Sequence, residues 1–350
     1  MIESENQQLQ TGQDAVQPVS TTPHSADPAG PTPPEVAQRI VDELRTVVVG
    51  QDRMVERLVC ALLSGGHVLL EGVPGVGKTM TLTALAKVVG GEFSRIQFTS
   101  DLLPSDILGT RVFSANTGEF TVSRGPIFAN FVLADEINRA PAKVQSALLE
   151  VMAEKQVTIA GESHQVPSPF LVLATQNPIE SEGVFPLPEA QRDRFMMRLI
   201  VPLPTLEQER EIARRHHAQA PAISQKVSLA ELIALQHVVS QIPTPDPVVD
   251  YAVRLTMASR FPGDHNLEEL VGAIRLGASP RATLAMLRAS RAMAVMRGRS
   301  VVAAQDVYDV AFDVLNHRIL LSYDAIADGV SSADVCATIL RTVLAPRGSR

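Results

Sequence analysis

The sequence predicts an α/β fold, in which a parallel sheet flanked by helices is followed by a smaller all-α domain. Three observations lead to this prediction. Short apolar runs with the length of buried strands alternate with helical patterns between residues 68 and 201, which is typical of a parallel sheet with helices on both faces. A glycine-rich phosphate-binding pattern follows the first of these runs. After Pro204 the strand pattern ends and helical patterns alone continue.

Residues 1–34 differ in composition from the rest of the chain. They contain no Lys, Arg or aromatic residue and are rich in Gln, Ser, Thr, Pro and Asp. Such a segment cannot bury enough apolar surface to offset the entropy lost on ordering it, so we expect a disordered tail. We place the sheet-containing nucleotide-binding core at residues 35–204 and the all-α lid domain at residues 205–350.

The patterns predict the elements in order along the core. A helix from Pro34 and a helix at 52–64 precede the first strand. Strands are expected at 68–70, 94–98, 130–135, 170–175 and 198–201, with helices at 78–89 and 142–154. Two β-hairpins are expected, with turns at Asn116-Thr117-Gly118 and near Gly161. Helices of the second domain are expected at 206–218, 229–242, 247–259, 280–296, 303–317 and 332–343.

The chain is organised around the stretch HVLLEGVPGVGKT, in which residues 72–79 fit the phosphate-loop pattern G-x-x-x-x-G-K-[ST]. Its glycines allow backbone angles that direct successive N–H groups at one anion. Lys78 is predicted to reach the β- and γ-phosphates of a nucleotide, and the hydroxyl of Thr79 to ligate Mg²⁺. The predicted cofactor-binding residues of this loop are Gly72, Val73, Pro74, Gly75, Val76, Gly77, Lys78 and Thr79. A glycine-rich turn that precedes a lysine by chance is the alternative, and the flanking strand and helix argue against it.

Two acidic residues, Asp135 and Glu136, follow the apolar run FVLA at the carboxyl end of a predicted strand. Open α/β sheets bind their ligands at that end. Asp135 is predicted to hold the hydration shell of Mg²⁺, and Glu136 to polarise the water that attacks the γ-phosphate. The alternative is an acidic pair that begins the next helix, where the helix dipole favours negative charge.

Four further residues are candidates for the site. Asn177 ends the next predicted strand, where its amide could bond both the γ-phosphate and the attacking water, but an Asn-Pro pair is also a common turn signal. Arg192 and Arg194 could stabilise transition-state charge, or could form a salt bridge with Asp193 or Glu189. Arg281 lies at a helix start, where a cation opposes the dipole, which favours a functional reason.

Composition narrows the class of protein. The formal net charge of −7 argues against a dedicated nucleic-acid partner. Cys60 and Cys336 are both expected to be buried free thiols in a reducing compartment. The sequence has no apolar run long enough for a transmembrane helix and no cleavable leader pattern, so we expect a cytoplasmic protein.

The order of these motifs is that of AAA+ ATPases, and within them the sequence closely resembles the MoxR family. The matching stretches run from Val48 almost to the end of the chain. They include HVLLEGVPGVGKT, RIQFTSDLLPSDILGT, VLADEINRAPAKVQSALLEVMAEKQVTIAG, ATQNPIESEGVFPLPEAQRDRFMMR and GASPRA.

This resemblance implies an ATP hydrolase that uses ATP and Mg²⁺ and assembles into a homo-oligomer, a hexameric ring, with sites between neighbours. Asn177 then corresponds to the sensor asparagine, Arg194 to the arginine that acts across the subunit boundary, and Arg281 to the lid arginine. The segment beside adenine is matched by Val48, Val49 and Gly50. The two hairpins resemble inserts that line the face of such rings. Members of the family are thought to act as chaperones that assemble or activate partner proteins, often together with proteins that carry von Willebrand factor A domains.

Two positions depart from the family pattern. Gly77 stands where relatives often have alanine, which brings the loop closer to the general phosphate-loop pattern. Arg192 stands where relatives usually have an apolar residue, so either Arg192 or Arg194 could reach a neighbour. A magnesium-chelatase-like motor subunit, a DNA helicase and a nucleotide-sensing scaffold are the alternative functions. The acidic charge argues against the helicase, and Glu136 and Asn177 argue against the scaffold.

Overall fold

The computed structural model describes residues 31–73, 75–115, 118–177, 183–217 and 222–346. The tail predicted for residues 1–34 lies almost wholly outside these residues and stays a prediction, as does the domain boundary near residue 204. From Pro33 onward the described residues belong to one compact unit. None of the described helices combines the length and the apolar character that a membrane span requires.

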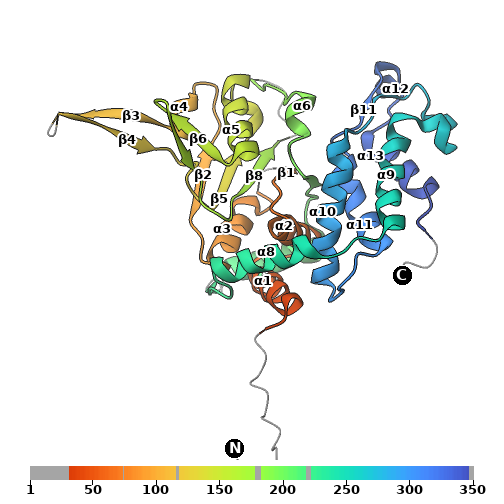
Figure 1. Cartoon of the computed structure of the whole chain (residues 1–350), viewed down its shortest axis with the longest axis horizontal. Helices are drawn as coiled ribbons and strands as arrows, with labels where there is room; N and C mark the ends of the chain where they lie inside the picture. The colour runs from red at the N-terminus through yellow and green to blue at the C-terminus, as the bar shows by residue number, and fades with distance from the viewer. Residues whose placement is uncertain (1–30, 74, 116–117, 178–182, 218–221, 347–350) are drawn as a thin grey trace, which may run out of the picture. The chain divides into compact units, whose positions relative to one another are not determined.

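A five-stranded sheet lies at the centre of this unit (Figure 1). Every strand pair in it is parallel, and the strand order is β2-β5-β8-β1-β9. The strands are β1 (Val68–Glu71), β2 (Phe93–Gln97), β5 (Phe131–Asp135), β8 (Leu171–Gln176) and β9 (Met197–Ile200). The strands β1, β5 and β8 end at Glu71, Asp135 and Gln176. We call this side of the sheet, formed by the carboxyl ends of the strands, the phosphate edge. The opposite side, where β1, β8 and β9 begin, is called the amino edge.

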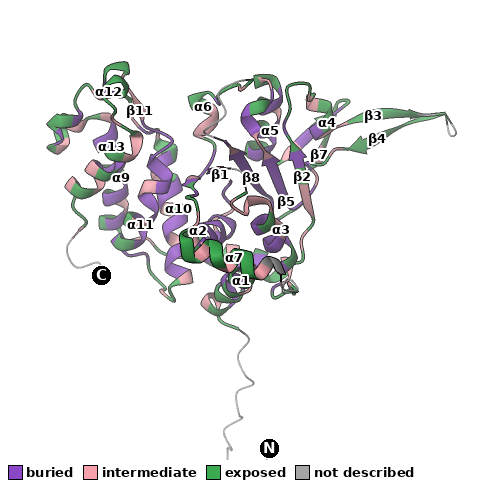
Figure 2. Cartoon of the chain, turned by 180° about the vertical axis from the view of Figure 1, so that it is seen from behind, coloured by how far each residue is buried: buried purple, intermediate pink, exposed green. Residues whose placement is uncertain are grey.

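Helices cover both faces of the sheet, as the alternating pattern predicted. Val68 and Leu70 of β1 are fully buried in a cluster with α1 (Pro33–Val47), α2 (Asp52–Leu63) and α3 (Lys78–Val88). Leu69 is fully buried in a second cluster, with α5 (Ala142–Glu154). Successive side chains of a strand point to opposite faces, so this strand contributes to both clusters. Figure 2 shows the buried strands β1, β5 and β8 between the helices.

Both predicted hairpins are present. β3 (Gly109–Ser114) pairs with β4 (Glu119–Arg124), and β6 (Gln156–Ile159) pairs with β7 (Glu162–Gln165), each pair antiparallel. Ala160 and Gly161 have φ of 52° and 88°, the left-handed angles of a two-residue hairpin turn. The other predicted turn falls partly on residues 116 and 117, which lie outside the described residues. The β3–β4 hairpin, preceded by α4 (Pro104–Leu108), extends away from the sheet in Figure 1.

Helices dominate the chain after β9, as predicted. They are α7 (Leu206–His217), α8 (Leu229–Gln241), α9 (Asp246–Arg260), α10 (Pro280–Met296), α11 (Ala304–Leu315), α12 (Tyr323–Ala327) and α13 (Ser332–Thr342). The expectation of helices alone needs a correction, because β10 (Ile274–Leu276) and β11 (Leu320–Leu321) form a small antiparallel pair. Strands of three and two residues are too short to show a two-residue period, and their partners lie far apart in the sequence.

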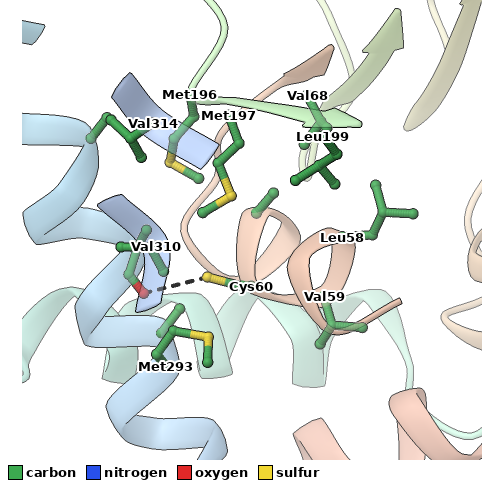
Figure 3. Packing of buried hydrophobic residues seen from close by; sticks show 14 of the residues in the cluster. Leu58, Val59, Cys60, Val68, Met196, Met197, Leu199, Met293, Val310 and Val314 are labelled. Atoms are coloured by element: carbon green, nitrogen blue, oxygen red, sulfur yellow. Dashed lines mark hydrogen bonds between the residues drawn. The ribbon is translucent and has the colours of Figure 1, made fainter. Parts of the chain in front are cut away.

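The helices of the second half pack directly on α2. The thiol of Cys60 donates a hydrogen bond to the carbonyl oxygen of Ala289 in α10, over 3.4 Å. Figure 3 shows this bond among buried side chains from α2, β9, α10 and α11, including Met197, Met293 and Val310. Cys60 and Cys336 are both buried and free, as predicted, and burial raises the pKa of each thiol to about 12.

A buried ion pair strengthens the same junction. Arg57 of α2 is only 6% exposed, and its Nε donates to the carboxylate of Asp313 in α11 over 2.9 Å. Its Nη2 donates to the carbonyl oxygen of Asp309 over 2.8 Å. A buried ion pair, as well as apolar packing and the Cys60 bond, therefore joins α2 to α10 and α11.

Candidate functional site

The phosphate loop leaves the middle of the sheet and leads into α3. Gly75 and Gly77 have φ of 84° and 82°, left-handed angles that favour glycine, and Gly77 is the N-cap residue that directly precedes α3. A Cβ on Gly72 would lie 2.8 Å from the carbonyl oxygen of Val201, so the loop passes β9 too closely for a side chain. Val73 and Val76 are half-buried, and Pro74 lies outside the described residues. The backbone N–H groups at the start of α3 thus face the phosphate edge, where the helix dipole favours an anion.

Lys78 and Thr79 lie in the first turn of α3, both half-buried. The ammonium of Lys78 donates to the carbonyl oxygen of Gly72 over 2.7 Å. Burial lowers the pKa of this ammonium, and the carboxylates of Asp135 and Glu136 oppose that shift. The lysine is therefore within electrostatic reach of both acidic residues.

Thr175, which the sequence analysis did not select, holds the acidic pair at the end of β5. Its hydroxyl donates to Oδ1 of Asp135 over 2.6 Å and accepts the backbone N–H of Glu136 over 2.8 Å. Glu136 has φ of 57° and ψ of 50°, a left-handed conformation that is uncommon for a residue other than glycine. The left-handed turn at Glu136 ends the extended backbone of β5, so the Glu136 side chain does not continue the alternation of the strand.

Three polar side chains that lie outside the phosphate loop donate hydrogen bonds to the carboxylates of Asp135 and Glu136. Nε and Nη2 of Arg95 donate to Oδ2 of Asp135 over 3.1 and 2.7 Å. Nε2 of Gln97 and Nη1 of Arg139 donate to Oε2 of Glu136 over 2.8 and 3.0 Å. Arg95 and Gln97 belong to β2, which pairs with β5 so that Gln97 lies opposite Asp135. The polar pair in RIQ, near the end of a predicted strand, indicates polar side chains at this end of the sheet, but it does not identify the residues that they contact.

Asn177 follows the end of β8 at the same edge and is 7% exposed. The register pairs Glu71 of β1 with Gln176 of β8, and the backbone N–H of Gly72 donates to the carbonyl oxygen of Gln176 over 3.4 Å. Asn177 therefore follows directly on the strand residue that contacts the phosphate loop. The phosphate edge thus brings together five of the predicted residues, which are Lys78, Thr79, Asp135, Glu136 and Asn177.

The segment predicted beside adenine packs against the start of α7. Val48 is buried and Val49 and Gly50 are half-buried. The side-chain amide of Gln208 donates to the carbonyl oxygen of Gly50 over 3.2 Å, and that of Gln51 donates to the carbonyl oxygen of Pro202 over 3.2 Å. Hydrogen bonds from both sides therefore set the position of this segment.

Arg194 and Arg281 lie at the amino edge, away from the phosphate loop. Arg194 is exposed and precedes β9, and its Nη1 donates to the carbonyl oxygen of Leu149 in α5 over 2.7 Å. Arg281, at the start of α10, lies 3.5 Å from the carboxylate of Asp193. Both line one cavity of about 350 Å³ together with Gly65 and other residues that precede β1. The structure thus separates these two predicted residues from the five at the phosphate edge.

The cavity that holds both arginines is strongly basic. We call it the basic cavity, and its cationic lining residues are Lys155, Arg194, Arg281, Arg288 and Arg318. Asp193 is the carboxylate among the described lining residues, and Nε of Arg318 binds it over 2.8 Å. Arg288 donates to the carbonyl oxygens of Ser64 and Gly65 over 2.6 and 3.1 Å, and burial lowers its pKa. The uncompensated positive charge makes the basic cavity suited to an anion.

Arg192 and Arg194 face different surroundings. Arg192 is half-buried at the end of α6 (Glu189–Arg192), and burial lowers the pKa of its guanidinium, while the charges of Glu189 and Glu71 oppose that shift and Arg198 adds to it. Glu71 ends β1, so the side chain of Arg192 is influenced by charges within its own chain. Arg194 is the exposed member of the pair.

Two family models match the chain. One, described as the ATPase family associated with various cellular activities (AAA), matches residues 67–197, and an AAA lid domain matches residues 271–339. Chaperone MoxR1 of Mycobacterium tuberculosis is 50% identical over 334 residues, which cover 93% of this chain and 89% of that protein. Protein MoxR of Methylorubrum extorquens is 32% identical over 311 residues, covering 82% and 88%. A solved structure assigned as an ATPase of Cytophaga hutchinsonii is 44% identical with a TM-score of 0.85, covering 90% of this chain and 96% of that one.

These similarities extend over the site as well as the fold. The first matched range contains the phosphate loop, the acidic pair, Asn177 and Arg194, and the second contains Arg281. The relatives match along most of their own length, so the likeness is not confined to the nucleotide-binding part. The protein binds a nucleotide and is an ATP hydrolase of a family that forms oligomeric assemblies. It belongs to the MoxR family of AAA+ ATPases.

Proposed function

We propose that this enzyme couples ATP binding and hydrolysis to the chaperone-like assembly or activation of partner proteins. Support comes from the relative in Mycobacterium tuberculosis, which is named a chaperone and matches 93% of this chain. We infer that the partners include proteins with von Willebrand factor A domains. We also infer that the enzyme acts in the cytoplasm. The β3–β4 hairpin offers contact surface for such partners, because Phe113 and Phe120 are more than half exposed and pack against each other with ring centroids 5.1 Å apart.

At the phosphate edge, Lys78 neutralises the β- and γ-phosphates of ATP. Thr79 and Asp135 supply the hydroxyl and carboxylate oxygens that suit Mg²⁺, a hard cation that proteins usually hold by one or two carboxylates together with substrate phosphates. The described residues contain no cluster of three or more His, Cys, Asp or Glu side chains that could hold a metal alone, which agrees with such a shared site. When bound, Mg²⁺ would neutralise charge on the phosphate oxygens.

Hydrolysis requires a base and a group that orients the water. Glu136 accepts the proton of the attacking water, because its carboxylate lies beside the Asp135 position and on the same edge as Lys78. Asn177 holds the water and the γ-phosphate through its amide. Thr175 acts on both carboxyl residues at once, since it binds the side chain of Asp135 and the backbone of Glu136.

The observation that carries the proposal of intersubunit sites is the separation of the two edges. One chain presents the phosphate loop at one edge of the sheet and Arg194 and Arg281 at the other. A neighbouring copy that places its amino edge against this phosphate edge brings both arginines, and the rest of the basic cavity, to the bound ATP. Repetition of that contact closes a homo-oligomeric ring, which we infer to be a hexamer.

Substitution of the two neighbouring arginines tests this arrangement. Arg194→Ala is expected to bind ATP normally and to lose about 10³–10⁵-fold in turnover, the usual value of an arginine finger. Arg192→Ala is the matched control and is expected to retain far more turnover, since Arg192 is half-buried among charges of its own chain. Normal turnover of Arg194→Ala together with loss in Arg192→Ala would reverse the assignment.

The coupling to partners needs a separate experiment. Glu136→Gln is expected to stay in the ATP-bound state, and partner proteins should be retained on it in ATP and released in ADP. Lys78→Ala, which lacks the phosphate contact, serves as the control for retention that does not depend on nucleotide. An identical set of retained proteins on both variants would contradict the proposed coupling.

A further inference from the structure

The carboxylate of Asp135 is occupied on both oxygens by protein groups. Thr175 donates to Oδ1 over 2.6 Å, and two N–H groups of Arg95 converge on Oδ2 over 3.1 and 2.7 Å. The Asp135 side chain is 15% exposed, and that of Arg95 is 50% exposed. The ion pair therefore combines a largely shielded carboxylate with a cation that has open solvent on its other side. Arg95 is thus the part of this pair that can move away.

Arg95 also determines how its neighbour on β2 is oriented. Its Nη2 donates to Oε1 of Gln97 over 2.9 Å, and Nε2 of Gln97 donates to Glu136 over 2.8 Å. A guanidinium has donors only, so it selects the carbonyl end of the Gln97 amide and leaves the NH₂ end for Glu136. Residues two apart on a strand share a face, which is why Arg95 and Gln97 act together. The contact between Arg95 and Asp135 thus extends to the proposed base.

We propose that Arg95 is a positioning residue that competes with a divalent cation for Asp135 and so sets the Mg²⁺ concentration at which the site loads. This inference rests on the proposed role of Asp135 toward Mg²⁺. A guanidinium that donates twice to one carboxylate oxygen neutralises the charge that attracts the cation and occupies lone pairs that the hydration shell of the cation would use. Loading with Mg²⁺ therefore requires Arg95 to release or share Asp135.

The chain offers a matched control in Arg139. Its Nη1 binds Glu136 over 3.0 Å, its side chain is 47% exposed, and its removal changes the net charge by the same amount. It contacts the other carboxylate of the acidic pair. A general effect of lost positive charge would appear in variants of both arginines, whereas competition for Asp135 would appear only in Arg95 variants.

The test measures nucleotide binding rather than turnover. A fluorescent, non-hydrolysable ATP analogue is titrated in EDTA and then at rising Mg²⁺, and the Mg²⁺ midpoint of the tightened binding is determined. Arg95→Gln is expected to bind as the wild type does in EDTA and to lower the Mg²⁺ midpoint by about threefold to tenfold, the range for a partly shielded, charge-assisted pair. Arg139→Gln is expected to stay within about twofold of the wild type, since it leaves the Arg95–Asp135 pair intact. Arg95→Lys, which keeps the charge but loses the two converging donors, is expected to fall between Arg95→Gln and the wild type.

An unchanged or raised Mg²⁺ midpoint in Arg95→Gln overturns the inference, as does an equal shift in Arg139→Gln. If Arg95→Gln does not bind the analogue in EDTA, a wild-type midpoint in Arg95→Lys overturns it instead. The role of Asp135 toward Mg²⁺ and the competition by Arg95 are contradicted by different results. If binding by the wild-type chain does not respond to Mg²⁺ at all, the proposed role of Asp135 is wrong and the inference falls with it. If the wild type responds and the Arg95 variants do not differ from it, only the inference is wrong.

Discussion

Replacing His67 by glutamine is expected to make the stability of this protein less dependent on pH. His67 precedes β1 at the amino edge and is only 6% exposed. Its Nδ1 accepts the backbone N–H of Val172 over 3.0 Å, so Nε2 carries the proton and donates to the carbonyl oxygen of Met152 over 3.2 Å. Both nitrogens have their partners only when the ring is neutral. Protonation would turn Nδ1 into a donor that faces another donor.

The magnitude follows from the pKa of the ring. Burial lowers the pKa of His67 from 6.5 to about 4, because the charged ring would lose its hydration. Between these values the unfolded chain binds a proton that the folded chain does not, so the stabilisation is complete above about pH 6.5 and is lost as the pH falls toward 4. The full difference is worth about 3 kcal/mol, and the part lost at pH 5 is about 2 kcal/mol.

Urea unfolding at pH 7.5 and pH 5.0 measures this effect. The wild type is expected to lose about 2 kcal/mol more between the two pH values than His67→Gln does. His317 is also buried, and burial lowers its pKa in the same direction, but it remains in both proteins and cancels in the comparison. Equal losses in the two proteins would show that His67 is not held neutral, and would refute the reasoning.

Three further predictions concern the phosphate edge and the lid junction. Lys78→Ala is expected to abolish ATP binding, because the ammonium that neutralises the phosphates is lost, and near-normal affinity in a nucleotide titration would make the phosphate-loop assignment wrong. Glu136→Gln is expected to bind ATP but to lose about 10²–10⁴-fold in turnover, the usual value of a positioned general base, and wild-type turnover would place the base elsewhere. Arg57→Ala is expected to cost about 1.5–3 kcal/mol in urea unfolding, because one oxygen of the Asp313 carboxylate loses its buried donor while the exposed Arg53 still binds the other oxygen over 2.9 Å. The exposed Arg45, paired with Asp52, serves as the control, and Arg45→Ala should cost less than about 1 kcal/mol. A similar cost for both arginine variants would contradict the stabilising role of burial.

The sequence allowed the central sheet and the phosphate edge to be predicted because each strand carries its own local signal. The runs ending at Glu71, Asp135 and Gln176 are apolar enough to identify buried strands, and parallel strands place their carboxyl ends together. Polar residues just after such strands were therefore predictable as neighbours. Both hairpins were predictable for a similar reason, since a glycine turn between alternating runs is a short-range pattern.

Contacts that depend on which strands are adjacent could not be predicted. β2 pairs with β5 across an intervening hairpin, so nothing local indicated that Arg95 and Gln97 reach the carboxylates of Asp135 and Glu136. The position of Arg281 could not be predicted from the sequence for the same reason. A helix start in the second domain can lie at either edge of the sheet, and long-range contacts such as Ser279 with Asp193 and Arg288 with Ser64 place it at the amino edge. The β10–β11 pair was missed because its strands are too short to show a period.

The most direct test of the intersubunit site is ATP turnover per subunit, measured across a dilution series that spans assembled and monomeric protein. Each phosphate edge is proposed to need Arg194 and Arg281 from a neighbouring copy, so turnover per subunit is predicted to fall steeply as the assembly dissociates. The fall should approach the residual rate of Arg194→Ala at the same nucleotide concentration. Turnover per subunit that stays constant down to monomeric protein would show that one chain holds a complete site, and would contradict the account.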